Sequence, residues 1–351
     1  MTEIGVGLIG YGLGGRVFHA PFVQATPGMA LRAIVSRDAA EVLAHHPNVA
    51  VAPDVDTLLA RDDIDLVIVC SPDELHAPHA LAAIAAGKHV LVDKPFATSL
   101  ADAGAVASGA DAAGVLLTIF QNRRWDADFL TLRGMIDDGQ LGRIVHFESH
   151  FDRWRPQAPA VWKEARAGGS WFDLGPHLVD QALQLFGMPQ AVTADFATLR
   201  DSAPALDWFH VVLHYDSCRA VLHSSKLAAD HGLRFMVHGT GGSWIKQGLD
   251  MQEPAILAGK GLGHPDLGID PVEGKYTAAT DGASPVSIPN QRGDYGAFWR
   301  ALAQAVRGEG SNPVPAAQAL MVMAVLDAGL ASARERRTID MDALRATLLQ
   351  D

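Results

Sequence analysis

The chain has 351 residues, of which 48% are hydrophobic and 19% are charged. This much apolar material is sufficient for the cores of two domains in an ordinary soluble globular protein. The formal net charge is -12, and the basic residues are scattered along the sequence rather than clustered. Neither a nucleic acid nor an anionic membrane is therefore expected as a partner, because neither would find a broad basic surface.

The only two cysteines are Cys70 and Cys218, so at most one disulfide bridge can form. Cys70 lies in the apolar run DLVIVCSP, where a buried free thiol is the usual state. The N-terminal MTEIGVGLIG lacks a basic segment followed by a long apolar one, and no later stretch approaches roughly 18 uninterrupted apolar residues. We therefore expect neither an export signal nor a membrane span, and a reducing, cytoplasmic location.

Short runs rich in Val, Ile and Leu alternate with alanine-rich stretches up to about residue 122. Strands made of continuous apolar residues are buried on both faces, as in a parallel sheet covered by helices. Residues 1–122 are therefore predicted to form a doubly wound α/β domain. The expected strands are residues 4–10, 30–37, 49–53, 65–71, 88–95 and 115–120, and the expected helices include residues 74–86 and 99–113.

The pattern changes after Phe120, where turns rather than helices separate the apolar runs. Residues 126–139 have the pattern of an amphipathic helix ended by glycine, and residues 143–154 alternate between two faces. Residues 123–351 are therefore predicted to form an α+β domain with a mainly antiparallel open sheet, one face of which is solvated or covered by a partner. Further strands are expected at residues 191–199, 207–215, 219–227 and 233–239.

Residues 250–290 are rich in Gly and Pro and have no clear period. We expect them to form a long excursion, either a lid or an oligomer contact. Two helices, near residues 293–307 and 315–334, are expected to close the chain.

The alternating run at residues 143–154 raises the possibility of a metal site. Three potential ligands, His146, Glu148 and His150, share one strand face, but no further ligand follows at a recognisable spacing. The sequence therefore predicts no metal site. The expected faces carry Val145, Phe147 and Phe151 on one side, and His146, Glu148, His150 and Asp152 on the other.

Gly10, Gly12 and Gly15 have the spacing G-x-G-x-x-G, with Leu13 inside the motif. They follow an expected strand and precede a plausible helix, which is the context in which this motif binds a dinucleotide. The glycines allow a tight turn, close approach of backbone N–H groups to a pyrophosphate, and close packing of helix against strand. We therefore expect these residues to contact a dinucleotide; the alternative is a flexible turn without a ligand.

The second expected strand ends in AIVSRD, about 20 residues beyond the motif, where NAD-binding folds usually place an acid. Here Ser36 and Arg37 occupy that place. A hydroxyl and a guanidinium would donate hydrogen bonds to a 2'-phosphate that a carboxylate would repel, so NADP is favoured over NAD. NAD stays possible, because a register change of one residue would restore an acid, Asp38, and Arg37 could be a solvated surface charge.

Three residues supply the chemistry that alcohol oxidation requires. Lys94 follows an apolar strand, at the edge of an α/β sheet where ligands bind, and Asp173 and His177 share one face if a helix runs through them. His177 would accept the hydroxyl proton, Lys94 would stabilise the developing alkoxide, and Asp173 would orient the imidazole or share its proton. Alternatively, Pro176 begins the helix, Asp173 caps it, and His177 is an ordinary polar residue.

Six segments spread along nearly the whole chain carry a resemblance to a known family. They are GYGLGGRVFHAPF, VIVCSPDELHAPHA, AGKHVLVDKPFATS, QNRRWDADFLTL, WFDLGPHLVDQALQLFGMP and ERRTIDM. The sequence resembles the glucose-fructose oxidoreductase / inositol dehydrogenase / MocA (Gfo/Idh/MocA) family, and more narrowly its NADP-dependent scyllo-inositol dehydrogenases. The resemblance implies an N-terminal Rossmann domain and catalytic roles for Lys94, Asp173 and His177. The chain departs from the family in having Asp93 where Glu is commoner, which shortens a carboxylate near the cofactor.

The resemblance also implies further contacts with the cofactor and the substrate. The loop after the fourth strand should lie along the nicotinamide, and residues 121–124 should form the crossover between the domains. Trp162 resembles a tryptophan near the nicotinamide and Tyr295 could reach the pocket, although ordinary packing would explain either residue. The implied cofactor contacts are Ser71, Pro72, His76, Asp93, Lys94, Arg123 and Trp162.

Taken together, the sequence predicts an oxidoreductase that transfers a hydride between NADP, or NAD, and a hydroxyl of a polyol or sugar resembling scyllo-inositol. One alternative is a family member that uses bound NAD(P) transiently, of the epimerase or glycosidase type. Another is a non-catalytic NADP-binding sensor. The polar face at residues 146–152 and the segment 250–290 suggest packing against a second copy, and the resemblance implies a homodimer or homotetramer.

Overall fold

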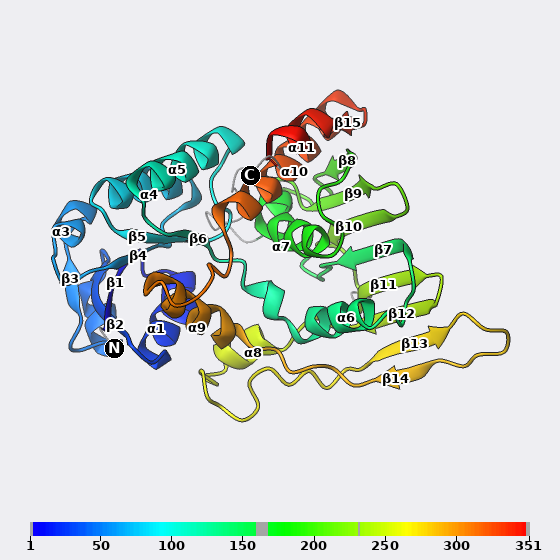
Figure 1. Cartoon of the computed structure of the whole chain (residues 1–351), viewed down its shortest axis with the longest axis horizontal. Coiled ribbons are helices and arrows are strands. Elements are labelled where there is room, and N and C mark those ends of the chain that lie inside the picture. Colours follow the sequence, from blue (N-terminus) through cyan, green and yellow to red (C-terminus); the bar gives the residue numbers. More distant parts are fainter. Residues whose placement is uncertain (1–2, 159–167, 231, 349–351) are drawn as a thin grey trace. The chain divides into compact units, whose positions relative to one another are not determined.

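A computed structural model describes residues 3–158, 168–230 and 232–348, and it divides the chain into two compact units (Figure 1). Unit 1 comprises Met1–Asn122, Glu253–Leu267 and Asp294–Leu320. Unit 2 comprises Arg123–Gln252, Gly268–Gly293 and Met321–Asp351. The units therefore differ from a single division at residue 122, because two later segments pack with the N-terminal part.

Unit 1 is built on a six-stranded sheet in the order β3-β2-β1-β4-β5-β6, in which every adjacent pair is parallel. The order reverses between β1 and β4, which is the switch point of a doubly wound fold. The predicted α/β class is therefore confirmed. The strands are β1 Ile4–Ile9, β2 Met29–Val35, β3 Ala50–Ala52, β4 Leu66–Val69, β5 His89–Val92 and β6 Leu117–Ile119.

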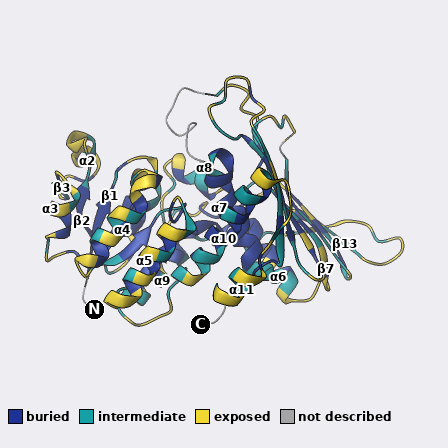
Figure 2. Cartoon of the chain, turned by 90° about the horizontal axis from the view of Figure 1, so that it is seen from above, coloured by how far each residue is buried: buried dark blue, intermediate teal, exposed yellow. Residues whose placement is uncertain are grey.

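Helices cover both faces of this sheet, because its strands are apolar on both sides. Figure 2 shows the buried strands lying among these helices. Two of the helices begin where the sequence supplies a capping side chain: Ser99 accepts a hydrogen bond from Asp102 N, and Asp54 accepts one from Thr57 N. The helices of unit 1 include α1 Ala20–Ala25, α2 Ala39–His45, α3 Val55–Leu59, α4 His76–Ala85, α5 Leu100–Ala113 and α9 Tyr295–Val306.

Unit 2 contains a nine-stranded sheet in the order β14-β13-β12-β11-β7-β10-β9-β8-β15. Neighbouring strands are antiparallel except for β7 and β10, which confirms the mainly antiparallel sheet. Helices α6 Ala127–Asp137 and α7 Gly169–Phe186 lie on one side of it (Figure 2). The strands are β7 Ile144–His150, β8 Ala191–Ala197, β9 Trp208–His214, β10 Arg219–Ser225, β11 Leu233–Gly239, β12 Gly242–Gln247, β13 Gly274–Ala278, β14 Val286–Ile288 and β15 Ile339–Asp340.

The expected alternation along β7 is wrong at its first residues. Val145 was expected to share the buried face with Phe147, but its side chain is 40% exposed. The pairing with β11 shifts between His238 and Gly239, whose partners are His146 and Ile144. Val145 is therefore the extra residue of a β-bulge, and the regular alternation begins after it.

Residues 250–290 are also more regular than expected. They contain the short helix α8 Gln252–Leu257 and the strands β13 and β14, which pair with each other and extend the sheet from β12. This hairpin is visible at the edge of the sheet in Figure 1. The hairpin of β13 and β14 is thus part of the sheet, whereas the rest of the expected excursion lies outside it.

Helix α10 Ala316–Glu335 is the one described helix that is long and apolar enough, by length and composition, to cross a membrane. Half of its apolar stretch is buried inside the structure. The core helix of a globular protein has the same properties, so this helix is weak support for a membrane span.

Candidate functional site

The glycine-rich turn follows β1 and requires glycine at both of its ends. Gly10 has a φ of 99°, and a Cβ atom there would lie 2.4 Å from Cys70 O. A Cβ atom on Gly15 would lie 2.4 Å from Gly10 O. The chain then continues as a π-helical turn, Gly15–His19, into α1, which has Pro21 in its first turn. The helical geometry thus changes from π to α next to Pro21.

The middle of the turn is open to a ligand. A Cβ atom on Gly12 would meet nothing within 4 Å, and the adjacent Leu13 side chain is 41% exposed. Backbone N–H groups in such a turn are accessible to the oxygens of a pyrophosphate. The residues of this turn thus fit a dinucleotide.

The end of β2 presents a hydroxyl and a guanidinium, while the neighbouring carboxylate has another role. Asp38 Oδ1 accepts a hydrogen bond from Glu41 N, 2.9 Å away, and so caps α2. Asp38 N donates to Ser36 Oγ over 3.1 Å, which holds the loop. Arg37 is exposed, and no hydrogen bond or ion pair within the described ranges engages its side chain. The Asp38 carboxylate, which could have favoured NAD, is thus engaged in capping α2.

The loop after β4 is tied to the loop after β5 by one buried histidine. His76 Nε2 lies 2.9 Å from Ser71 O, and His76 Nδ1 lies 2.7 Å from Pro95 O. His79 Nδ1 lies 3.0 Å from Ser71 Oγ. His76 thus fixes the loop that carries Ser71 and Pro72, and is itself buried behind it.

Asp93 directly follows β5 and Lys94 comes next in the same loop, where Asp93 is surrounded by hydrogen-bond donors. Lys94 N donates to Asp93 Oδ1 over 2.8 Å, and the Cys70 thiol donates to Oδ2 over 3.2 Å. His19 Nε2 lies 3.3 Å from Asp93 Oδ2. Burial acts to raise the pKa of Asp93, but the His19 imidazole, with His76 and Lys94, lowers that pKa far below its usual range. Asp93 is therefore an ionised carboxylate that fixes the backbone of Lys94.

Asp173 and His177 lie on α7 of unit 2, four residues apart and hence on one helix face. The helix begins at Gly169, so Asp173 is inside it and is not its N-cap. Pro176 is likewise inside the helix rather than in its first turn. The alternative in which Asp173 only caps a helix is therefore wrong. His177 is 7% exposed and Asp173 is half-buried.

One buried ion pair and two hydrogen bonds of a glutamine, which the sequence did not reveal, hold α7 in place. Arg124 donates two hydrogen bonds to Asp180, Nε to Oδ2 over 2.9 Å and Nη2 to Oδ1 over 2.6 Å. Gln181 Nε2 donates to Arg123 O over 2.8 Å, and Gln181 Oε1 accepts from Arg234 Nη2 over 2.7 Å. Asp180 and Gln181 lie about one turn after His177 along the helix. These bonds fix the helix that presents Asp173 and His177.

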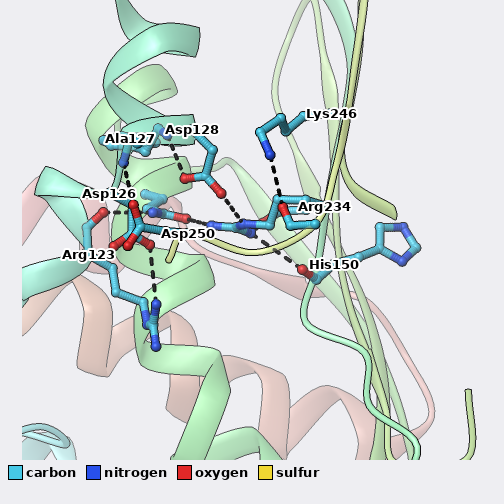
Figure 3. A network of polar contacts seen from close by, with 12 residues as sticks. Arg123, Asp126, Ala127, Asp128, His150, Arg234, Lys246 and Asp250 are labelled. Atoms are coloured by element: carbon cyan, nitrogen blue, oxygen red, sulfur yellow. Dashed lines mark hydrogen bonds and ion pairs between the residues drawn. The ribbon is translucent and has the colours of Figure 1, made fainter. Parts of the chain in front are cut away.

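Arg234 is the centre of this network, as Figure 3 shows. Its Nε donates to Asp128 Oδ2 over 2.9 Å and its Nη1 to Ser149 Oγ over 2.8 Å. Its guanidinium carbon lies 3.9 Å from the centroid of the Phe235 ring. Arg234 thus connects α6, β7 and α7 through one buried cation.

Two further carboxyls in the network, Asp126 and Asp250, are held with raised pKa values. Burial and the Asp128 charge raise the pKa of Asp250 to about 6, against opposing hydrogen bonds from Ala127 N and Gln252 N. Burial and the Asp250 charge raise the pKa of Asp126 well above its usual value, although Arg123 acts in the other direction. The folded chain therefore binds protons that the unfolded chain releases above about pH 4.

Replacing Asp126 with asparagine is expected to stabilise the chain more at pH 8 than at pH 5, relative to the unaltered protein. Because both folded-state pKa values are raised, the carboxyls cost little below about pH 4; the cost then grows from that pH, where the unfolded chain ionises them, up to the folded-state pKa values, that of Asp250 being about 6. Asparagine stays neutral, so the difference in free energy of unfolding between the variant and the unaltered protein should be larger at pH 8 than at pH 5. Denaturant titrations of both proteins at the two pH values measure it, and a pH-independent difference would contradict this assignment.

Three further residues were predicted to contact the cofactor or the substrate: Arg123, Tyr295 and Trp162. The guanidinium of Arg123 is engaged within unit 2, where Nη1 lies 3.3 Å from Asp126 Oδ2 and the guanidinium carbon lies 4.9 Å from the centroid of the Phe151 ring. Tyr295 is 1% exposed at the start of α9, in the core of unit 1, as expected for a packing residue. Trp162 lies outside the described residues.

Comparisons with known proteins agree with this arrangement. A model described as an oxidoreductase family, NAD-binding Rossmann fold, matches residues 4–121, and one described as the C-terminal alpha/beta domain of that family matches residues 133–341. The protein named uncharacterized oxidoreductase YdgJ of Escherichia coli (strain K12) is 44% identical over 341 residues, which cover 96% of this chain and 98% of that protein. The scyllo-inositol 2-dehydrogenase (NADP(+)) IolW of Bacillus subtilis (strain 168) is 36% identical and covers 97% of both chains.

The fold comparison extends to solved structures. A crystal structure of a Klebsiella pneumoniae protein has a TM-score of 0.93 and 42% identity to this chain, and the match covers 100% of this chain and 99% of that one. The two family models together account for both units of the structure. The chain is an oxidoreductase with an NAD-binding Rossmann domain, and it belongs to the Gfo/Idh/MocA family.

Proposed function

We propose that the chain is a dehydrogenase that oxidises a ring hydroxyl of a polyol or sugar resembling scyllo-inositol, with NADP as its preferred cofactor. The observation that carries this proposal is the continuous course of α7 through Asp173 and His177, since it leaves a buried imidazole with a carboxylate one turn away. The substrate class is supported by the 36% identity to a scyllo-inositol 2-dehydrogenase along nearly the whole chain.

Each proposed catalytic residue has one task. His177 accepts the proton of the substrate hydroxyl, and Asp173 orients the imidazole and favours its protonated form. Lys94, placed after β5 by Asp93, stabilises the negative charge that develops on the substrate oxygen. The nicotinamide, when bound, accepts the hydride that leaves the substrate carbon.

Gly10, Gly12, Leu13 and Gly15 would hold the pyrophosphate of the cofactor, and the loop of Ser71, Pro72 and His76 would lie beside the nicotinamide. The first group is supported by the open space over Gly12, the second by the tie from His76 to Pro95, next to Lys94. A non-catalytic NADP sensor would need neither Lys94 nor the pair on α7.

Net turnover separates a dehydrogenase from a family member that uses its cofactor transiently. A dehydrogenase should form one reduced nicotinamide for every ketone produced, with free cofactor as a stoichiometric reactant. A transient mechanism of the epimerase or glycosidase type should instead convert substrate with no accumulation of reduced cofactor. Parallel measurement of nicotinamide absorbance and of product by chromatography distinguishes them, and conversion without reduced cofactor would overturn the proposal.

The cofactor preference should depend on Arg37. Replacing Arg37 with alanine is expected to reduce the preference for NADP over NAD by about 1–3 kcal/mol, the scale of a lost charge-assisted hydrogen bond. Arg61→Ala is the matched control, because Arg61 is a surface arginine of unit 1 that pairs with Asp63. The ratio of kcat/KM values for the two cofactors measures the effect. Equal efficiency with both cofactors in the unaltered protein would contradict the assignment of Ser36 and Arg37.

We also propose that the chain forms a homo-oligomer through the open face of the nine-stranded sheet. Cross-strand pairing aligns four apolar side chains around Glu148 in one row of that face: Val212, Val221, Met236 and Ile245. In a symmetric dimer, this row on one chain would pack against the same row on the second chain, and both would be buried. Light scattering at micromolar concentration should give a dimer or tetramer, and Ile245→Asp should shift it toward monomer; a monomeric unaltered chain would refute the proposal.

We also propose a cytoplasmic location, from the state of the two cysteines. Neither Cys70 nor Cys218 is in a disulfide bond, which is the usual state of cysteines in a reducing compartment.

A further inference from the structure

Three histidines lie side by side across neighbouring strands on the open face of the sheet in unit 2. His223 on β10 pairs with His210 on β9 and with His150 on β7. The ring centroids are 5.5 Å apart for His210 and His223, and 5.1 Å apart for His150 and His223. Strand pairing thus brings to His150 a second imidazole that is 73 residues away in sequence, which no local spacing could reveal.

Asp152, just beyond β7, lies between two of these rings. Its Oδ2 is 3.1 Å from His150 Nδ1, and its Oδ1 is 3.7 Å from His223 Nε2. One nitrogen or oxygen atom from each of the three residues lies within 4.8 Å of the others. We propose that His150, Asp152 and His223 bind a divalent transition-metal ion.

The donor set matches the chemistry of such an ion. Two imidazole nitrogens and one carboxylate oxygen are ligands of Zn²⁺ and of neighbouring divalent ions such as Co²⁺ and Ni²⁺, whereas Mg²⁺ and Ca²⁺ select oxygen donors. Bond lengths of about 2.0–2.2 Å separate tetrahedral ligand atoms by roughly 3.3–3.6 Å, so only small side-chain shifts are needed. Three protein ligands leave a fourth position for water.

Hydrogen bonds to two of the proposed ligands, His150 and Asp152, hold their side chains in position for metal binding. Glu148 Oε2 lies 2.9 Å from His150 Nε2, the ring nitrogen that faces away from Asp152. A carboxylate on the far nitrogen of a histidine ligand fixes the tautomer and the ring orientation. Asp152 Oδ1 also accepts a hydrogen bond from Ser225 N over 2.7 Å, which orients its carboxylate.

Burial is intermediate, as expected for a site that an ion can enter. The side chains of His150, Asp152 and His223 are 13%, 9% and 17% exposed. The site belongs to unit 2 alone and uses neither Lys94 nor the pair on α7, so it is independent of the proposed hydride transfer. The metal site is two residues further along β7 and β10 than the row in which Val221 lies opposite Glu148.

The experiment is a metal titration of the full chain, after removal of any affinity tag and treatment with a chelator. Calorimetry with Zn²⁺ and visible absorption with Co²⁺ should each show one ion per chain, and the Co²⁺ spectrum should have the intensity of a low-coordinate site. His223→Asn and Asp152→Asn should abolish this site or weaken it by more than about tenfold. Glu148→Gln should weaken it by about 10–100-fold through the orientation of His150.

His214→Asn is the matched control, because His214 lies on the same face of β9, four residues from His210. Its Nε2 is hydrogen-bonded to Thr193 Oγ1 instead of lying at the proposed metal site. This variant should bind the ions as the unaltered chain does. The thermal midpoint of each variant without metal shows whether it folds. If a ligand variant does not fold, the weakened metal binding of Glu148→Gln tests the site instead. The proposal is overturned if the unaltered chain binds no ion at micromolar concentrations, or if the ligand variants bind as tightly as His214→Asn.

Discussion

Replacing His177 with alanine is expected to lower turnover by about 10²–10⁴-fold, the usual loss when a general base is removed. The reason is that no other imidazole is proposed to accept the hydroxyl proton. NADP binding should be retained, because His177 belongs to unit 2 and the glycine-rich turn to unit 1. Single-turnover hydride transfer, cofactor affinity and thermal midpoint should be measured on one preparation.

The competing explanation is that His177 only packs inside α7. In that case the variant should have a lowered thermal midpoint and near-normal hydride transfer per folded molecule, which would contradict the catalytic assignment. His214→Ala controls for the loss of a histidine elsewhere in unit 2. Lys94→Ala should also lower turnover, and the double variant should lose much less than the product of the two single losses, because both groups are proposed to act on one oxygen.

Replacing Arg234 with alanine is expected to lower the free energy of unfolding by about 3–5 kcal/mol. Arg234 and Asp128 are 1% and 0% exposed, so the variant leaves a buried carboxylate without its cation. Ser149 and Gln181 lose their hydrogen bonds to Arg234 as well. Denaturant titration measures the change, and the catalytic rate at low temperature should fall too if Gln181 helps to hold α7.

Two companion variants test the cause of this loss. Arg234→Lys keeps the charge but cannot form all the hydrogen bonds of the guanidinium, so it should recover only part of the stability. Adding Asp128→Asn to Arg234→Ala should recover part of it as well, since the unpaired charge is then removed. A loss below about 1 kcal/mol in Arg234→Ala, or no recovery in the double variant, would contradict the proposed network.

The sequence predicted the parts of the fold that depend on local pattern. The strands of unit 1 are continuous apolar runs bounded by turns, and burial on both faces follows directly from that composition. Gly10 could be recognised because its spacing reflects a backbone conformation, and the structure shows the positive φ and the nearby Cys70 carbonyl that exclude a side chain.

Features that depend on pairing between distant residues could not be predicted in this way. The bulge at Val145 arises from the register of β11, and the neighbouring positions of His150 and His223 arise from the pairing of β7 and β10. The charged residues that hold α7 are scattered through the sequence, with Arg124 and Asp180 separated by 56 residues. Pro176 was misleading for a local reason, because proline usually starts helices and here lies inside one.

Transfer of deuterium from a labelled substrate to the cofactor tests the proposed activity most directly. Incubation of the chain with NADP and scyllo-inositol deuterated at its ring carbons should give a reduced nicotinamide that carries one deuterium, detected by mass spectrometry. The same labelled substrate with His177→Ala should give it at a greatly reduced rate. Absence of deuterium in the cofactor, for scyllo-inositol and for a panel of other inositols and aldoses, would contradict the account.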